Sequence, residues 1–411
     1  MKRFILAAAL TLSVVASGVA QQNHIDNVTP LAPELAAYGT FNIGVTTLHA
    51  TDRNRHDILN IKDGGPDVRY DRTLTIEVWY PAALAAGQKP AGEYRVVTRE
   101  PSITATLYGK AVRDAAPLSA GSAFPLVIIS HGYPGNRFLL SHLGENLASK
   151  GFVVASIDHK DSTYDDQQAF ASTLYNRAYD QLFVLNEMAR LGRSGSASPL
   201  AGRVDADRTG LVGYSMGGYG VVNAVGGGYT TTSATGRGAP PNTLLLERSA
   251  SNAEYRNARD PRIKAAIAIA PWGMQGGYWD AEGLKGIRTP VLFVAGSVDS
   301  TAGYENGTKA IFKQAVNADR YLLTFLNANH NAGAPIPAPV ETYGTSAFAH
   351  YADAVWDTTR MNNILDHFAT AYFDLYLKGE QDKQAYLDPS WKGFKPRTAA
   401  GLTLEHLRPG Q

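Results

Sequence analysis

The 411-residue chain contains no cysteine, and its 38 Lys and Arg residues almost balance its 37 Asp and Glu residues. The absence of cysteine excludes disulfides, cysteine-ligated zinc, iron–sulfur clusters and a thiol nucleophile. A net charge of +1 gives no overall attraction to nucleic acid or anionic lipid, so we expect neither as a partner. Hydrophobic residues make up 44% of the chain and charged residues 18%, which is typical of a globular protein with a core.

Long apolar runs are also scarce, and the one at the N-terminus is typical of a secretory signal. Lys2 and Arg3 precede an uncharged run from Phe4 to Val15, and small residues follow up to Ala20. The run is shorter than the ~20 residues that a membrane-spanning helix needs. We therefore expect residues 1–20 to be a signal peptide, the protein to be exported to the periplasm or secreted, and the mature chain to have no membrane span.

What the sequence does contain is a repeated alternation of apolar strands and helix-length segments. Residues 125–130, 152–157 and 291–295 are continuous apolar runs, as expected for strands buried on both faces. Such alternation predicts an α/β fold with a mostly parallel central sheet flanked by helices. We expect residues 21–71 to be a polar N-terminal extension and residues 72–411 to be a single domain.

Two segments interrupt this alternation, residues 226–260 and residues 331–345. The first is rich in Gly, Thr, Ser, Asn and Pro, and the second in Pro, Gly and Ala. Both are longer than ordinary connections between elements. We interpret them as loop insertions that form a lid or rim near an active site, although solvated loops without a role are equally consistent with the composition.

The most informative motif is Gly213-Tyr-Ser-Met-Gly217, which matches the pattern G-x-S-x-G. It lies between a short predicted strand at residues 209–213 and a predicted helix at residues 217–225. In this context a sharp turn lifts the serine hydroxyl clear of the sheet, and glycine avoids a clash where the chain doubles back. A phosphate-binding loop is excluded because no Gly-Lys-Ser/Thr follows. Ser215 is therefore the candidate nucleophile.

A serine hydroxyl is a weak nucleophile unless a base removes its proton. After such a turn, an acid and then a histidine are expected in loops that follow later strands. Asp299 follows the strand predicted at residues 291–295, and His330 follows the strand predicted at residues 321–326. We therefore predict that Ser215, Asp299 and His330 form a catalytic triad.

The triad also needs backbone N–H groups that stabilise the negative charge on the substrate carbonyl oxygen. One is expected from Met216, which follows the nucleophile, and the other from the loop that begins at Ser130. Pro134 has no N–H, so Tyr133 is the preferred donor in that loop, with Gly132 next.

Two clusters of charged residues are interpreted as structural. Acidic residues at 158, 161, 165 and 166 surround His159, and we expect them to face solvent at the start of a helix. Arg177 and Asp180 lie one turn apart on that helix and are interpreted as a surface pair. No HExxH or EF-hand pattern is present, so we expect no metal and no other cofactor.

With these motifs the chain resembles the α/β-hydrolase superfamily, and within it the dienelactone-hydrolase-like group. That group includes the cutinase-type polyester hydrolases and the platelet-activating-factor acetylhydrolase-like esterases. The matching segments are Val78-Trp-Tyr-Pro81, Ser130-His-Gly-Tyr133, Gly213-Tyr-Ser-Met-Gly-Gly218, Ala270-Pro-Trp272, Ala295-Gly-Ser-Val-Asp299, Asn329-His330 and a C-terminal segment at residues 373–379.

The resemblance implies Ser215 as nucleophile, His330 as base, Asp299 as the acid that orients it, and Tyr133 and Met216 as oxyanion donors. It also suggests the Trp272 ring as a wall of the substrate pocket, with the Tyr133 ring opposite. A core aromatic role for Trp272 is equally consistent with its position.

We therefore predict an exported serine hydrolase that cleaves small-molecule or oligomeric carboxylic esters through an acyl-enzyme, with no cofactor. The alternatives are a cutinase-like polyester hydrolase, an amidase or peptidase that uses the same triad, and a non-catalytic binding protein. The two loop insertions, if they roof the pocket, argue against a bulky polymer.

Overall fold

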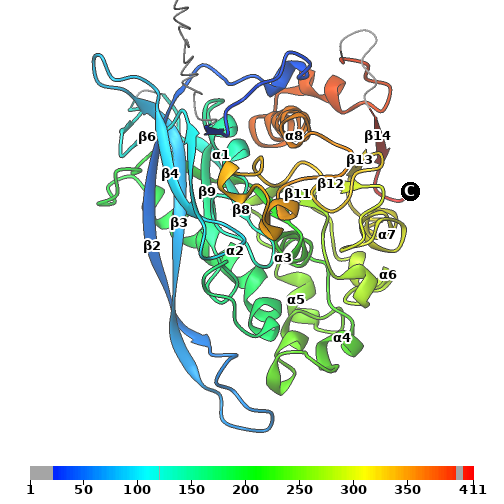
Figure 1. The fold of residues 1–411 in the computed structure, drawn as a ribbon. Helices are drawn as coiled ribbons and strands as arrows, with labels where there is room; N and C mark the ends of the chain where they lie inside the picture. The colour runs from blue at the N-terminus through cyan, green and yellow to red at the C-terminus, as the bar shows by residue number, and fades with distance from the viewer. Residues whose placement is uncertain (1–21, 120, 395–400) are drawn as a thin grey trace, which may run out of the picture.

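A sheet of 11 strands is the framework of the protein, whose computed structural model describes residues 22–119, 121–394 and 401–411 (Figure 1). Its central strands are all parallel. Across the sheet they follow the order β13 (Arg320–Phe325), β12 (Val291–Gly296), β11 (Ile263–Ile269), β10 (Val204–Tyr214), β8 (Phe124–Ser130) and β9 (Val153–Asp158). This topology confirms the predicted α/β fold. The expected signal peptide lies outside the described residues.

Towards its two edges the sheet becomes mixed. On one side β3 (Arg69–Ala83), β2 (Asn42–His56) and the short β7 (Ala116–Pro117) pair antiparallel, and the short β6 (Val112–Arg113) pairs parallel with β2; on the other side β14 (Leu402–Leu407) pairs antiparallel with β13. Residues 21–71, which we expected to be an extension, thus contribute β2 to the sheet, and the expected boundary at Asp71 falls within β3. A separate three-stranded sheet contains β1 (Asn23–His24), β5 (Thr104–Gly109) and β4 (Gly92–Val97).

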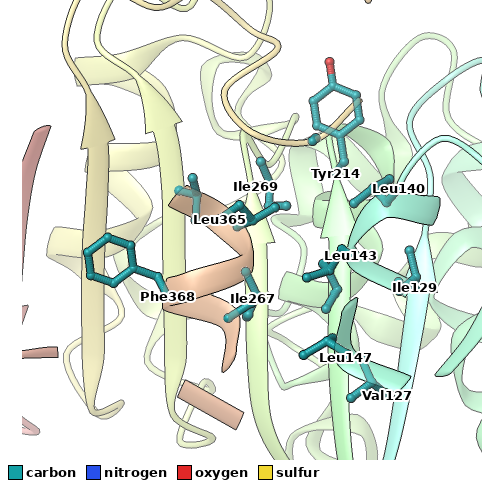
Figure 2. Packing of buried hydrophobic residues seen from close by; sticks show 14 of the residues in the cluster. Val127, Ile129, Leu140, Leu143, Leu147, Tyr214, Ile267, Ile269, Leu365 and Phe368 are labelled. Carbon is teal, nitrogen blue, oxygen red and sulfur yellow. The ribbon is translucent and has the colours of Figure 1, made fainter. Parts of the chain in front are cut away.

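Helices cover both faces of the large sheet (Figure 1). One face packs against α1 (Ser141–Ala148) and α8 (Thr358–Phe373), and the other against α2 (Phe170–Gly192), α3 (Met216–Ala224) and α7 (Lys309–Gln314). Alternate residues of each strand face opposite cores: Val127 and Ile129 pack with α1, as Figure 2 shows, whereas Leu126 and Ile128 join the core beside α2. Burial on both faces explains the continuous apolar runs.

The connections leaving the carboxyl ends of the parallel strands position the candidate site. Ser215 follows β10, Asp299 follows β12, and His330 follows β13, all at the same edge of the sheet. The 226–260 segment contains the short helices α4 (Thr231–Thr235) and α5 (Ala253–Asn257), and α6 (Ala281–Leu284) comes after β11. No helix in the described ranges is long and apolar enough to cross a membrane.

Candidate active site

The turn between β10 and α3 has the strained geometry that the motif predicts. Ser215 has φ 54° and ψ −114°, a region that non-glycine residues rarely occupy. Two glycines are required by close contacts: a Cβ on Gly213 would lie 2.2 Å from the Gly217 carbonyl oxygen, and one on Gly217 would lie 2.0 Å from that of Ser130. The turn therefore presents the serine side chain beyond the end of the sheet.

The structure brings Ser215, His330 and Asp299 together in one hydrogen-bonded relay, which we call the pocket triad. The distance from Ser215 Oγ to His330 Nε2 is 2.9 Å, and His330 Nδ1 lies 2.9 Å from Asp299 Oδ2 and 3.1 Å from Oδ1. Because an ionised carboxylate only accepts hydrogen bonds, Nδ1 carries the proton and Nε2 is free to accept from the serine hydroxyl. This is the tautomer that a general base for Ser215 requires.

Asp299 is held as an anion by its surroundings. Burial alone would raise the pKa of its carboxyl group, but the hydrogen bond from His330 and those from the backbone N–H groups of Ala302 and Thr301 outweigh burial and leave the pKa below its ordinary value. Both N–H groups donate over 2.8 Å. The carboxylate is thus fixed in place and ionised at neutral pH, which fixes the orientation of the His330 ring.

Ser215 and His330 line a cavity of about 590 Å³. Ser215 is only 8% exposed. The other lining residues come from five places in the chain: Arg99; Gly132, Tyr133 and Pro134; Tyr214 at the end of β10; Ser300 and Thr301 after β12; and, after β13, Asn329, Asn331, Phe348, Ala349, His350, Ala352, Asp353 and Ala354. Most residues of the last group lie just beyond the insertion expected at residues 331–345, and this contribution was not predicted.

The 226–260 insertion contributes no lining residue to this cavity. Several of its residues instead line a separate cavity of about 680 Å³ against α2. This side of the cavity is therefore lined by residues within 348–354 and by Asn331, while the longer insertion packs elsewhere.

The other histidine of the cavity, His350, is uncharged at neutral pH. Burial, together with the positive charge of Arg99 and the neighbouring His330, lowers the pKa of His350 to about 3. Its Nε2 lies 2.8 Å from the Tyr164 hydroxyl. His330 is thus the histidine of the cavity that is hydrogen-bonded to the serine.

The two predicted oxyanion donors lie beside the serine. Met216 begins α3, and a Cβ on Gly132 would lie 3.3 Å from Ser215 Cβ, so the loop that carries Tyr133 passes directly over the nucleophile. Within the described part of the chain, the backbone N–H groups of Tyr133 and Met216 donate no hydrogen bond to the protein. Both are available to a substrate carbonyl oxygen.

Trp272 lies next to the triad but is not among the residues that line the cavity. Its backbone N–H donates to the Ser215 carbonyl over 3.2 Å. Its ring packs edge-on against Phe170 at 5.3 Å, and Phe170 packs against Tyr133 at 5.0 Å between ring centroids. Of these three rings, Tyr133 is therefore the one that lines the cavity, and Trp272 lies on the far side of Phe170.

A second Ser–His–Asp relay, which we call the buried triad, was not predicted. Ser130 Oγ lies 2.8 Å from His159 Nε2, and His159 Nδ1 lies 3.0 Å from Asp180 Oδ2. Ser130 and Asp180 are fully buried, and His159 is 1% exposed. Asp180 also accepts hydrogen bonds from Arg72, which is buried as well.

Two interpretations made from the sequence are wrong here. Arg177 and Asp180 are not a surface pair, because both side chains are buried and neither bonds the other. Asp161 does not face solvent but binds Arg72 over 2.8 Å. The signal was present: Arg177 and Asp180 fall on the same stripe of α2 as the buried Leu174 and Val184.

Across the described ranges, no three His, Asp or Glu residues gather as a metal site. Two of the four acids around His159 are bound by arginines: Asp158 contacts Arg137, and Asp161 contacts Arg72.

The sequence is similar to several known hydrolases. A family model described as PET hydrolase-like matches residues 82–240, a range that includes Tyr133 and the turn at Ser215 but ends before Asp299 and His330. The chain is 25% identical over 245 residues to Cutinase est1 of Thermobifida alba, which is 59% of this chain and 65% of the cutinase. The match thus spans less than two thirds of that relative.

Other relatives carry different names. The chain is 24% identical over 276 residues to a bis(hydroxyethyl) terephthalate hydrolase of Streptomyces coelicolor, covering 67% of this chain and 71% of the relative. It is 40% identical over 80 residues to a platelet-activating factor acetylhydrolase of Cavia porcellus, which is 18% of each chain.

The fold has a counterpart among solved structures. A ferulic acid esterase from Streptomyces cinnamoneus superposes with a TM-score of 0.59 and 23% identity, over 92% of this chain and 100% of the other. The chain therefore has the α/β-hydrolase fold, and by sequence it is similar to polyester hydrolases and, over a shorter stretch, to platelet-activating factor acetylhydrolases.

Proposed function

We propose that the protein is a serine hydrolase that cleaves carboxylic esters through an acyl-enzyme on Ser215. The observation that carries the proposal is the relay from Ser215 through His330 to Asp299, which opens into a cavity. The names of the relatives support esters as the substrate class, since they include a cutinase, a terephthalate ester hydrolase and an acetylhydrolase. Export is proposed from the N-terminal sequence pattern alone.

Each residue of the site has a role in this reaction. His330 takes the proton of Ser215 as the hydroxyl attacks the ester carbonyl, and the N–H groups of Tyr133 and Met216 stabilise the oxyanion. The imidazolium, stabilised by Asp299, then protonates the leaving alcohol. A water molecule activated by His330 releases the acid and regenerates the serine.

A polyester is a second candidate for the substrate. Phe348, which lines the cavity, is 40% exposed, and the Tyr343 ring, which is 50% exposed, packs against it at 5.5 Å between ring centroids. Exposed apolar rings beside the cavity fit an ester with apolar groups on both sides of the scissile bond. Two relatives are named for cutin and terephthalate esters.

Labelling with a fluorophosphonate probe tests the nucleophile, because the probe reacts with activated serines. We expect the wild-type protein and Ser130→Ala to be labelled and Ser215→Ala to remain unlabelled and inactive. Ser130→Ala is the matched control, because Ser130 also bonds a histidine but is fully buried. An unlabelled wild-type protein, or labelling of Ser215→Ala, would contradict the proposal.

Wild-type enzyme that has not been exposed to the probe is then assayed on soluble short-chain esters, on the matching amides and on a polyester film. Hydrolysis of the esters with no turnover of the amides is the expected result. Hydrolysis of amides alone would show that the protein is an amidase. Release of soluble product from the film would favour the second candidate.

A further inference from the structure

A buried arginine lies directly beneath the loop that carries the Tyr133 N–H. Arg177, on α2, is 1% exposed, and in the described part of the chain its guanidinium makes no salt bridge. The nearby carboxylate of Asp180 is already bonded by Arg72, Arg55 and His159. Burying a cation without a carboxylate partner costs desolvation free energy, so the groups that do bind the Arg177 guanidinium need to be identified.

Those partners are the backbone carbonyls of the oxyanion loop. Arg177 Nη1 donates to the His131 carbonyl over 2.5 Å, and Nη2 donates to the Gly132 carbonyl over 3.3 Å. Nη2 also donates to Ser162 Oγ over 2.6 Å, which fixes the plane of the guanidinium. Arg177 therefore binds the carbonyls of the two peptides whose N–H groups belong to Gly132 and Tyr133.

His131 completes the support from the same buried side. Its Nε2 accepts the backbone N–H of His159 over 3.2 Å, so Nδ1 carries the proton and donates to the Gly132 carbonyl over 2.7 Å. Burial, with the positive charge of Arg177 and the neighbouring His159, holds the pKa of His131 well below its ordinary value, so the ring stays neutral.

These contacts decide where the N–H groups point. In a planar trans peptide the carbonyl and the N–H lie on opposite sides. With the carbonyls of His131 and Gly132 bound on the buried side, the N–H groups of Gly132 and Tyr133 are turned to the opposite side of the loop. Gly132 and Tyr133 both line the cavity with Ser215.

We propose that Arg177 is a positioning residue for the oxyanion site, which keeps the Tyr133 N–H directed at the substrate carbonyl oxygen and adds a positive charge behind it. The inference rests on the proposed hydrolase function. Arg177 does not contact the substrate; it acts through the peptide between Gly132 and Tyr133. Burial lowers the pKa of Arg177 to about 9, which leaves the side chain charged at neutral pH.

The test is Arg177→Met, assayed with a soluble p-nitrophenyl ester and an alkyl trifluoromethyl ketone, which adds to the serine as an oxyanion. Removal of one oxyanion donor costs about 10²–10³ in kcat, so a misdirected donor should cost at least about tenfold. We expect KM to stay within about threefold and the ketone inhibition constant to rise in parallel with the loss of kcat/KM. Rates are divided by the fraction of sites that a fluorophosphonate titrates.

Arg320→Met is the matched control. Arg320 is also fully buried, and among the described residues its guanidinium donates to main-chain oxygens alone, but these belong to Phe312, Ala318, Arg408 and Gln411 at the opposite end of β13. We expect this variant to lose stability while its kcat per titrated site and its ketone inhibition constant match the wild type. A merely structural effect would appear equally in both variants.

Arg177→Lys and Ser162→Ala keep the inference testable if Arg177→Met does not fold. A lysine at position 177 can donate to one of the two carbonyls, and Ser162→Ala removes the hydrogen bond that holds the guanidinium in its plane. Both variants should therefore show smaller losses than Arg177→Met, in kcat and in ketone affinity alike. Unchanged kcat and ketone affinity in a folded Arg177 variant, or a change in KM alone, would overturn the inference. A wild-type protein that is neither labelled nor active would instead overturn the proposed function.

Discussion

The pocket triad and the buried triad have the same three residue types and nearly the same hydrogen-bond lengths. Serine to histidine measures 2.9 Å in the first and 2.8 Å in the second, and histidine to aspartate measures 2.9 Å and 3.0 Å. Only the serine of the pocket triad lies on a strained turn and lines a cavity. The hydrogen-bonded relay alone therefore does not identify a catalytic site.

The two aspartates differ most clearly. Asp299 is bonded by His330 and by two backbone N–H groups, so its hydrogen bonds converge on orienting one histidine. Asp180 is bonded by Arg72 and Arg55 as well as by His159. We infer that the carboxylate of the pocket triad serves the reaction and that of the buried triad serves stability, and matched substitutions test this contrast.

The largest difference is expected between Asp299→Asn and Asp180→Asn. Loss of the charge that orients the histidine should lower kcat by about 10⁴ and change stability little, because the amide oxygen still accepts the backbone N–H groups. Removing the Asp180 charge leaves the buried guanidinium groups of Arg72 and Arg55 with one carboxylate partner fewer, Asp161 and Asp52 remaining, which should cost about 3–5 kcal/mol of unfolding free energy. Steady-state kinetics and urea denaturation measure the two effects.

Two results would contradict this division of roles between Asp299 and Asp180. A stable Asp180→Asn variant, or an Asp299→Asn variant that keeps its kcat but unfolds more easily, would show that burial does not separate the two roles.

Much of this architecture was predictable, and the reason lies in local patterns. Strands buried on both faces appear as continuous apolar runs, and the turn at Ser215 needs glycine at fixed positions, so the fold and the nucleophile follow from short segments. Asp299 and His330 could be placed because each follows a strand closely in the chain. The places of Ser215, Asp299 and His330 in the fold therefore depend mainly on the strand that precedes each of them, and little on contacts between distant segments.

The parts that were missed depend on contacts between distant segments. β14, at residues 402–407, pairs with β13, and residues within 348–354 line the cavity only because the chain returns to it. The buried triad joins Ser130, His159 and Asp180 from three different elements, and no spacing in the sequence marks it. Charged residues on α2 were read as exposed because burial of arginine and aspartate is rare without partners.

A smaller effect is expected on the pH dependence of stability. Burial, with the charge of Arg177, lowers the pKa of His159 to about 3, although its hydrogen bond to Asp180 opposes this shift. The unfolded chain protonates this histidine below pH about 6.5 while the folded protein does not, so the free energy of unfolding falls as pH decreases from about 6.5 towards 3. Each such proton contributes a slope of about 1.4 kcal/mol per pH unit.

Urea denaturation of the wild type and of His159→Asn between pH 7 and pH 4.5 measures this contribution. The variant should be less stable at pH 7, and its stability should fall less steeply with acid, by up to one proton. Equal slopes in the two proteins would mean that His159 is protonated in the folded state and that the buried triad carries a charge on its histidine.

The smallest effect is expected from the row of aromatic rings beside the pocket triad, which runs from Tyr133 through Phe170 to Trp272. Tyr133 lines the cavity, whereas Trp272 touches it only through Phe170, so Tyr133→Ala should raise KM about tenfold and Trp272→Ala by less than about threefold. Neither substitution removes a backbone N–H, so kcat should change little in both. The comparison uses one soluble aromatic ester and active-site titration. A larger rise in KM for Trp272→Ala would mean that the substrate extends past Tyr133 and contacts the Trp272 ring. The substrate-binding surface would then reach beyond the residues that line the cavity.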